Sequence, residues 1–223
     1  MRNLRMGESV LIIGESGSGK STSIRNLDPS STFIISVIGK PLPIKGFRNK
    51  YKHIDNWNDN KNNWYVSDNY QSILKCVDAV KKRDDIKVLI VDDFQYVMAN
   101  EFMRRASEPG WNKFSEISNH AWLIINEITN LRNDLVSFIL CHSETDEYGL
   151  VKTKTIGKML NEKISIEGMF TTVLHSMKND SGYQFLTQHD GKHLAKSPMG
   201  LFDDEYVPND LSLVLDKLAS YYE

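Results

Sequence analysis

Three observations predict an α/β fold, with a mostly parallel central sheet flanked by helices and a C-terminal antiparallel hairpin. Apolar runs of strand length alternate along the chain with segments of helical periodicity, as in doubly wound sheets. The first apolar run leads into a glycine-rich loop, and a later one ends in two carboxylates. The 223 residues, 40% of them apolar and 25% charged, are enough for one sizeable core. We therefore expect a single domain over residues 1–223.

The glycine-rich loop lies between a predicted strand, Ser9–Ile13, and a helix predicted to begin at Ser21. It matches the pattern G-x-x-x-x-G-K-[ST], in which backbone N–H groups surround phosphate oxygens. Lys20 is expected to reach the β- and γ-phosphates, and the Ser21 hydroxyl to join the Mg²⁺ shell. A glycine-rich turn that binds nothing is the alternative. The sequence thus predicts a site for ATP and Mg²⁺ formed by Gly14, Glu15, Ser16, Gly17, Ser18, Gly19, Lys20, Ser21 and Thr22.

A second strand is predicted at Thr32–Ser36, and the long segment 37–69 after it is rich in asparagine and lacks strong periodicity. We expect this segment to be an extended loop or insertion. It contributes to a stretch without a single acid, from Pro29 to Ile54, in a chain of net charge −2. The cations of that stretch are Lys40, Lys45, Arg48, Lys50 and Lys52.

Aromatic side chains accompany these cations, namely Phe47, Tyr51, His53, Trp57, Trp64 and Tyr65. Cations follow the backbone of a single strand of nucleic acid while aromatic faces stack on its bases. Single-stranded DNA is therefore a predicted partner of this segment. Solvated lysines, with some aromatics packed beneath the loop, are the alternative. A second candidate stretch contains Lys152, Lys154, Lys158 and Lys163.

After a helix that Asp68 is expected to cap, a third strand over Lys87–Val91 ends in Asp92 and Asp93. Ligands of open α/β sheets bind at the carboxyl ends of strands, so Asp92 is predicted to hold Mg²⁺. Asp93 would orient the attacking water if the strand has ended before it, because adjacent strand residues point to opposite faces. The alternative for Asp93 is a solvated acid in a turn.

Two helices are predicted at about 94–107 and 113–132, followed by a fourth strand over Leu135–Leu140. His142 and Ser143 come at the end of that strand and are candidates for contacts to the γ-phosphate or the attacking water. A surface histidine after a strand is the alternative for His142. A fifth strand, a hairpin ending in Tyr183–Thr187 and a last amphipathic helix after Pro208 complete the predicted elements.

The order of these motifs resembles that of the compact RecA-core P-loop ATPases of bacteriophages, which include small ATPases of single-strand annealing and recombination. The resemblance extends from the phosphate loop through Asp92 and His142-Ser143 to the segment Lys196–Gly200. It implies a P-loop NTPase with a RecA-like core, in which another strand separates the two motif-bearing strands. It also implies a homo-oligomer with ATP hydrolysed at the subunit interface, and single-stranded DNA as partner.

One departure concerns the catalytic glutamate that RecA carries at the end of the strand after the phosphate-loop helix. Here that strand continues as Ser36–Lys40 without an acid, so either Asp93 substitutes or hydrolysis is slow. In RecA-like assemblies a neighbouring subunit often supplies a cation to the γ-phosphate. Lys196 is the candidate for that role here, preferred over Lys192; two solvated lysines are the alternative.

The leading hypothesis is an ATP-dependent protein acting on single-stranded DNA in phage-type recombination or replication. A small-molecule or nucleotide kinase is one alternative, although only Arg104 and Arg105 among eight arginines are adjacent and could mark an arginine-bearing lid. A nucleotide-gated interaction protein with little turnover is another. Two cysteines without metal spacing and no apolar run of membrane-spanning length lead us to expect a cytoplasmic protein, in the host cell if phage-encoded.

Overall fold

The computed structural model describes residues 7–55, 61–157 and 159–222. Its strands are β1 Ser9–Gly14, β2 Thr32–Ser36, β3 Trp64–Val66, β4 Val88–Asp92, β5 Val136–Thr145, β6 Val151–Thr153, β7 Thr172–Asn179, β8 Gly182–Leu186 and β9 Tyr206–Pro208. Its α-helices are α1 Phe47–Lys50, α2 Tyr70–Lys81, α3 Gln95–Arg104, α4 Asn112–Thr129 and α5 Leu211–Tyr221. Three short helices of other types are η1 Ser21–Asn26, η2 Met159–Lys163 and η3 Glu167–Met169.

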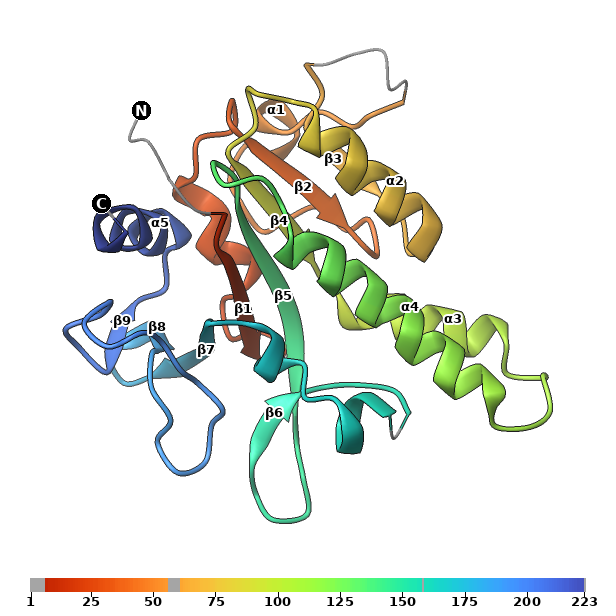
Figure 1. Cartoon of the computed structure of the whole chain (residues 1–223). Helices are drawn as coiled ribbons and strands as arrows, with labels where there is room; N and C mark the ends of the chain where they lie inside the picture. The colour runs from red at the N-terminus through yellow and green to blue at the C-terminus, as the bar shows by residue number, and fades with distance from the viewer. Residues whose placement is uncertain (1–6, 56–60, 158, 223) are drawn as a thin grey trace.

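Within the described residues, the nine strands form one sheet in the order β3-β2-β4-β5-β1-β7-β8-β9, with β6 paired to β5 outside that order (Figure 1). The strands from β3 to β7 along this order run parallel, and β7, β8 and β9 are antiparallel neighbours. The mostly parallel sheet and the C-terminal hairpin confirm the predicted fold class. Strand β5 separates β1 from β4, as expected for a RecA-like core.

The register of the parallel strands determines which residues meet at the carboxyl edge of the sheet. Gly14 at the end of β1 is level with His142 on β5, and Ser36 on β2 is level with Asp92 on β4. The phosphate loop, the carboxylate pair and His142 therefore reach the same edge, although more than a hundred residues separate the first from the last.

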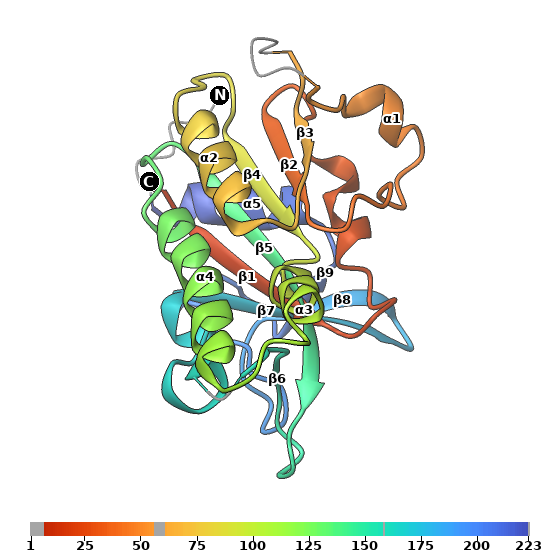
Figure 2. The same ribbon diagram turned by 90° about the vertical axis from the view of Figure 1, so that its right-hand side faces the viewer.

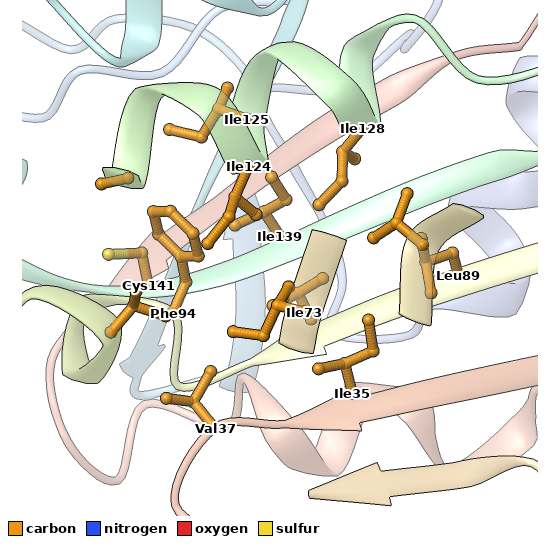
Figure 3. Close-up of a cluster of buried hydrophobic side chains, with 14 of the residues drawn as sticks. Ile35, Val37, Ile73, Leu89, Phe94, Ile124, Ile125, Ile128, Ile139 and Cys141 are labelled. Carbon is orange, nitrogen blue, oxygen red and sulfur yellow. The ribbon is translucent and has the colours of Figure 1, made fainter. Parts of the chain in front are cut away.

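Helices cover both faces of the sheet (Figures 1 and 2). Helices α2, α3 and α4 pack on one face, where Ile73, Ile124 and Ile128 contact strand residues such as Leu89 and Ile139 (Figure 3). On the other face, η1, α1 and α5 contribute Ile24, Phe47 and Leu218 to a second buried cluster. The strands are thus apolar on both sides, as a parallel sheet between two helical layers requires.

The sequence predicted an extended loop or insertion for the segment 37–69, and the structure shows more regular elements there than an extended loop would have. Its described part holds the short helix α1 and the edge strand β3, and Leu42, Phe47, Tyr51 and Ile54 are buried. Apolar residues placed between the prolines and asparagines anchor it to the sheet. Trp57 lies outside the described residues.

The start of α2 also differs from the prediction. Asn69, not Asp68, is the N-cap, and its side chain accepts the N–H of Ser72. Asp68 instead accepts hydrogen bonds from Asn100 and Arg104 on α3. Both cysteines are buried free thiols, as expected. None of the helices among the described residues is long and apolar enough to cross a bilayer.

Candidate nucleotide-binding site

The phosphate loop is closed around its own lysine. The Nζ atom of Lys20 donates hydrogen bonds to the carbonyls of Gly14 and Glu15, each at 2.8 Å. Lys20 is almost fully buried, and this burial lowers the pKa of its ammonium group. Gly17 and Gly19 have φ of +81° and +99°, a region that favours glycine. The backbone therefore takes the inward-turned course that phosphate binding needs.

Ser21 and Asp92 come together beneath this loop. The Ser21 hydroxyl lies 3.0 and 3.1 Å from the two carboxylate oxygens of Asp92, which is fully buried. Burial raises the pKa of Asp92 to about 7, and the neighbouring charge of Asp93 adds to that effect. A cation here would offset the cost of a buried carboxylate, and hydroxyl and carboxylate oxygens are ligands that Mg²⁺ takes. The residues that the sequence assigned to Mg²⁺ therefore fit it.

Asp93 follows directly after β4 in a left-handed conformation, with φ of +62°. The strand has ended, so Asp93 does not point away from the nucleotide site as the next strand residue would. Its side chain is 2% exposed, with Oδ2 at 2.7 Å from Lys40 Nζ and Oδ1 at 3.5 Å from His142 Nε2. Burial acts to raise the pKa of Asp93, but hydrogen bonds from His142 and Lys40 outweigh it and lower the pKa.

Lys40 borders the hollow of the nucleotide site and pairs with Asp93, a position that the sequence, which placed it on a nucleic-acid surface, did not predict. Burial acts to lower its pKa, but the hydrogen bond and charge of Asp93 raise it overall. Lys40 lies in the segment that follows β2, where the resemblance led us to expect an acid. The charge pattern alone could not show this, because it does not reveal that β2 and β4 end side by side.

His142 and Ser143 have different surroundings. His142 borders the same hollow as Lys20 and Asp93, and its backbone N–H donates to the side chain of Gln95 at 3.1 Å. Ser143 is level with Thr153 on β6, and its hydroxyl is buried without a hydrogen-bond partner in the described residues. It is not among the residues bordering the hollow, so only His142 is placed to contact a phosphate.

The hollow above the phosphate loop has a volume of about 580 Å³ and includes residues that the sequence reasoning missed. Arg25, Tyr183 and Asn209 border it. Arg25 donates to the carbonyl of Asn209 at 2.6 Å, and a Cβ added to Gly19 would lie 2.9 Å from Tyr183. The hairpin β7–β8 and the entry to α5 bring Tyr183 and Asn209 here. No local sequence pattern marks either residue as part of a nucleotide site.

The phosphate loop is also tied to β7 and to Asn209. The Ser176 hydroxyl donates to the carbonyl of Ser18 at 2.8 Å and accepts from the side chain of Asn209 at 3.0 Å. A Cβ on Gly14 would lie 2.4 Å from the Ser176 carbonyl oxygen, so only glycine fits there. The loop is thereby held against the strand that continues into the hairpin.

The remaining predicted cations lie outside the hollow. Lys45, Arg48, Lys50 and Lys52 are exposed on α1 and its flanks. Phe47 and Tyr51 are 4% and 2% exposed and stack on each other, so the expected base stacking on these two rings is wrong. Lys196 is exposed, and its backbone pairs with that of Val173 in β7. Of the second stretch, Lys152 pairs with Asp146, and Lys158 lies outside the described residues.

A lysine-bearing phosphate loop, a buried carboxylate at a strand end and an intervening strand at the carboxyl edge of a parallel sheet define a P-loop NTPase domain. The family model described as "AAA domain" matches residues 6–199. The chain belongs to this AAA domain family.

Among solved structures, the chain is similar to a KaiC-like protein of the hyperthermophilic archaeon Pyrococcus horikoshii OT3. The identity is 12% and the TM-score 0.46, over 81% of this chain and 76% of that one. A search of curated proteins finds no match.

Proposed function

We propose that this protein binds ATP with Mg²⁺, hydrolyses it slowly, and couples the nucleotide to holding single-stranded DNA in phage-type recombination or replication. The observation that carries the proposal is the convergence of Lys20, Ser21, Asp93 and His142 around one hollow. Asp92 lies behind them and accepts the hydroxyl of Ser21. The family assignment supports nucleotide binding and hydrolysis.

The residues divide the work of phosphoryl transfer between them. Lys20 would exchange its two carbonyl partners for the β- and γ-phosphates, and Ser21 and Asp92 would hold Mg²⁺, which neutralises charge on the phosphates. Asp93, with its lowered pKa, would accept a proton from the attacking water or orient it. His142 would contact the γ-phosphate.

Slow turnover follows from the partner of Asp93. Lys40 holds that carboxylate in an ion pair of 2.7 Å, which leaves it a weak base. The Lys40 side chain is 48% exposed and borders the hollow, so a γ-phosphate could draw it away from Asp93. This arrangement also supports the second candidate function, a nucleotide-gated binder with little turnover.

The DNA contact would be made by the basic quartet Lys45, Arg48, Lys50 and Lys52. The quartet is connected to the nucleotide site through Lys40 and Pro43, which border the hollow a few residues earlier in the chain. Because Phe47 and Tyr51 are buried, we expect the quartet to bind backbone phosphates without sequence preference. Lys196 would act on the nucleotide of a neighbouring subunit in a homo-oligomer.

The test is ATP turnover measured with and without single-stranded DNA. We expect slow basal turnover that DNA increases several-fold. Phosphate transfer to a small acceptor without DNA would instead identify a kinase. Near-zero turnover that DNA does not change, together with DNA binding, would favour the gated binder.

The variant Lys20→Ala provides the control for the nucleotide site. Removing a charge-assisted contact to phosphate should weaken ATP binding by roughly 100-fold. Binding of a fluorescent ATP analogue measures this loss, and an unchanged melting temperature without nucleotide shows that the fold is kept. Lys75→Ala, an exposed lysine on α2, should bind ATP as the wild type does.

A further inference from the structure

A second hollow lies on the other side of the phosphate loop. This rear hollow, of about 290 Å³, is bordered by Glu15–Ser18 of the loop, by His175–Lys178 of β7, and by Lys192 and His193. Ser16 and Gly17 border both hollows, so the phosphate loop is the wall between them. The volume corresponds to roughly ten liquid waters, which is enough for a phosphate and part of its sugar.

His175 is a buried polar residue without a partner at the wall of the rear hollow. Its exposed fraction is 3%, and its Nδ1 has no hydrogen-bond partner among the described residues. Buried polar groups are nearly always paired, so an unpaired ring nitrogen beside a hollow indicates a missing partner. The nucleotide mechanism does not use this side chain.

Cations stand at the same hollow. No ion pair of Lys178 or Lys192 is found within residues 7–55, 61–157 and 159–222. The carboxylate of Asp190 is occupied by the ring of His193 and by the N–H groups of Lys192 and His193. Glu15 is the remaining acid at the wall. The occupant should therefore be an anion that takes several hydrogen bonds.

A metal ion fits this hollow poorly. The described residues contain no group of three or more His, Cys, Asp or Glu side chains that could hold one. The two histidine rings lie with centroids 4.5 Å apart, but their neighbours are lysines, which repel a cation.

We propose that the rear hollow binds a phosphate group, held by His175, Lys178 and Lys192, and that the phosphate loop senses its presence as the shared wall. The Ser176–Ser18 hydrogen bond joins the strand that carries His175 to the loop. A phosphate in the rear hollow would thus contact the strand and the loop wall that position the nucleotide-binding backbone. The phosphate could come from a nucleic-acid backbone or from free phosphate. The site stands independently of whether the protein hydrolyses ATP.

The test follows the histidine ring signals by NMR in the whole protein, with Mg²⁺ and ADP present to fill the nucleotide site. Inorganic phosphate and a short oligothymidylate are the two probes, and a His175→Asn variant assigns the His175 signals. We expect a saturable shift of the His175 ring. A shift with both probes indicates a general phosphate site, and a shift with the oligothymidylate alone indicates a backbone phosphate.

The variant Lys178→Ala/Lys192→Ala separates the rear hollow from the nucleotide site. Both lysines are exposed, so the fold should be kept, which the melting temperature checks. Apparent affinity for the probe should fall about 10-fold. The matched control Lys82→Ala, at the exposed residue that follows α2, should leave the affinity for the probe unchanged. No shift of His175 with either probe, or an undiminished shift in the double variant, would overturn the proposal.

Discussion

The backbone conformation of Asp93 determines where its carboxylate points, and therefore whether it can act in the nucleotide site. A left-handed conformation is uncommon outside glycine, but aspartate and asparagine tolerate it better than most residues. A longer glutamate would be less suited to this backbone, which gives a physical reason for the shorter acid. The sequence showed two adjacent carboxylates, and only the turn after β4 decided that both serve one site.

His175 leads to a prediction about pH. Burial lowers its pKa to about 4, and the positive charge of His193 lowers it as well; Lys20 and Lys192 act in the same direction, while Asp190 opposes them. An unfolded histidine titrates near 6.5, so the unfolded chain gains a proton first as the pH falls. Above about pH 6.5 His175 is neutral in both states and does not reduce the free energy of unfolding. Between about pH 6.5 and pH 4 the unfolded state binds the extra proton, so the free energy of unfolding falls.

The free energy of unfolding in urea at pH 7.5, 5.5 and 4 measures this effect. The wild type should lose up to about 3 kcal/mol more than His175→Gln over this range, because the variant removes the titrating group. Parallel pH profiles for the two proteins would show that His175 does not carry the dependence. Saturating phosphate should reduce the loss if the rear hollow is occupied.

The sequence identified Lys20, Ser21, Asp92 and Asp93 because a phosphate loop is a local pattern and a strand-end acid is nearly so. The place of Lys40 beside Asp93 and that of Tyr183 at the hollow were both missed. Each residue reaches the site through strand pairing or a hairpin. The spacing of residues along the chain does not show which strands are neighbours in the sheet, so it cannot predict which strand ends lie together.

At the scale of elements, the basic quartet around α1 leads to a prediction about salt. Each phosphate neutralised on a single strand contributes about −0.7 to the slope of log affinity against log salt concentration, so four contacts give about −3. The variant Lys50→Ala should flatten the slope by about 0.7, whatever the DNA sequence. Fluorescence anisotropy of a labelled oligonucleotide at several salt concentrations measures this slope.

Lys75→Ala is the control for the quartet, because Lys75 is exposed on α2 and lies outside the basic segment. A slope near zero for the wild type, or an equal change with Lys75→Ala, would place the DNA contact elsewhere. Affinity that depends strongly on base sequence would also contradict binding through the backbone alone.

Element types and order were largely predictable, because strands buried on both faces have continuous apolar runs and helices keep their periodicity. The short strands β6 and β9 were not predicted, and neither were the elements of the segment 37–69. Its helix α1 is four residues long and β3 three, which is too short for any periodicity to show. Tertiary contacts of Leu42, Phe47 and Ile54 determine its structure, and those contacts cannot be seen in a local pattern.

At the scale of the whole molecule, the proposed homo-oligomer makes a prediction that a mixture can test. If Lys196 serves the nucleotide of a neighbour, Lys20→Ala and Lys196→Ala should each be inactive alone but restore activity together. An interface is intact when the first variant supplies Lys196 and the second supplies Lys20. When equal amounts of the two variants assemble at random, roughly one quarter of all interfaces are intact in this sense.

Steady-state ATP turnover of the mixture, with total protein held constant, measures this recovery. Size-exclusion chromatography shows whether the two variants assemble. Full activity of Lys196→Ala alone, or no recovery in assemblies that form, would remove Lys196 from the reaction.

The position of β1 in the sheet has a consequence for how the protein is made. Both neighbours of β1 are late strands, since Leu11 is level with Ile139 on β5 and with Val173 on β7. At ribosomal rates of about 5–20 residues per second, β1 waits roughly 6 to 25 seconds for β5 to be synthesised. During synthesis the nascent chain therefore exposes the apolar run Val10–Ile13, which is fully buried in the folded protein. Chaperone demand should peak before β7 leaves the ribosome.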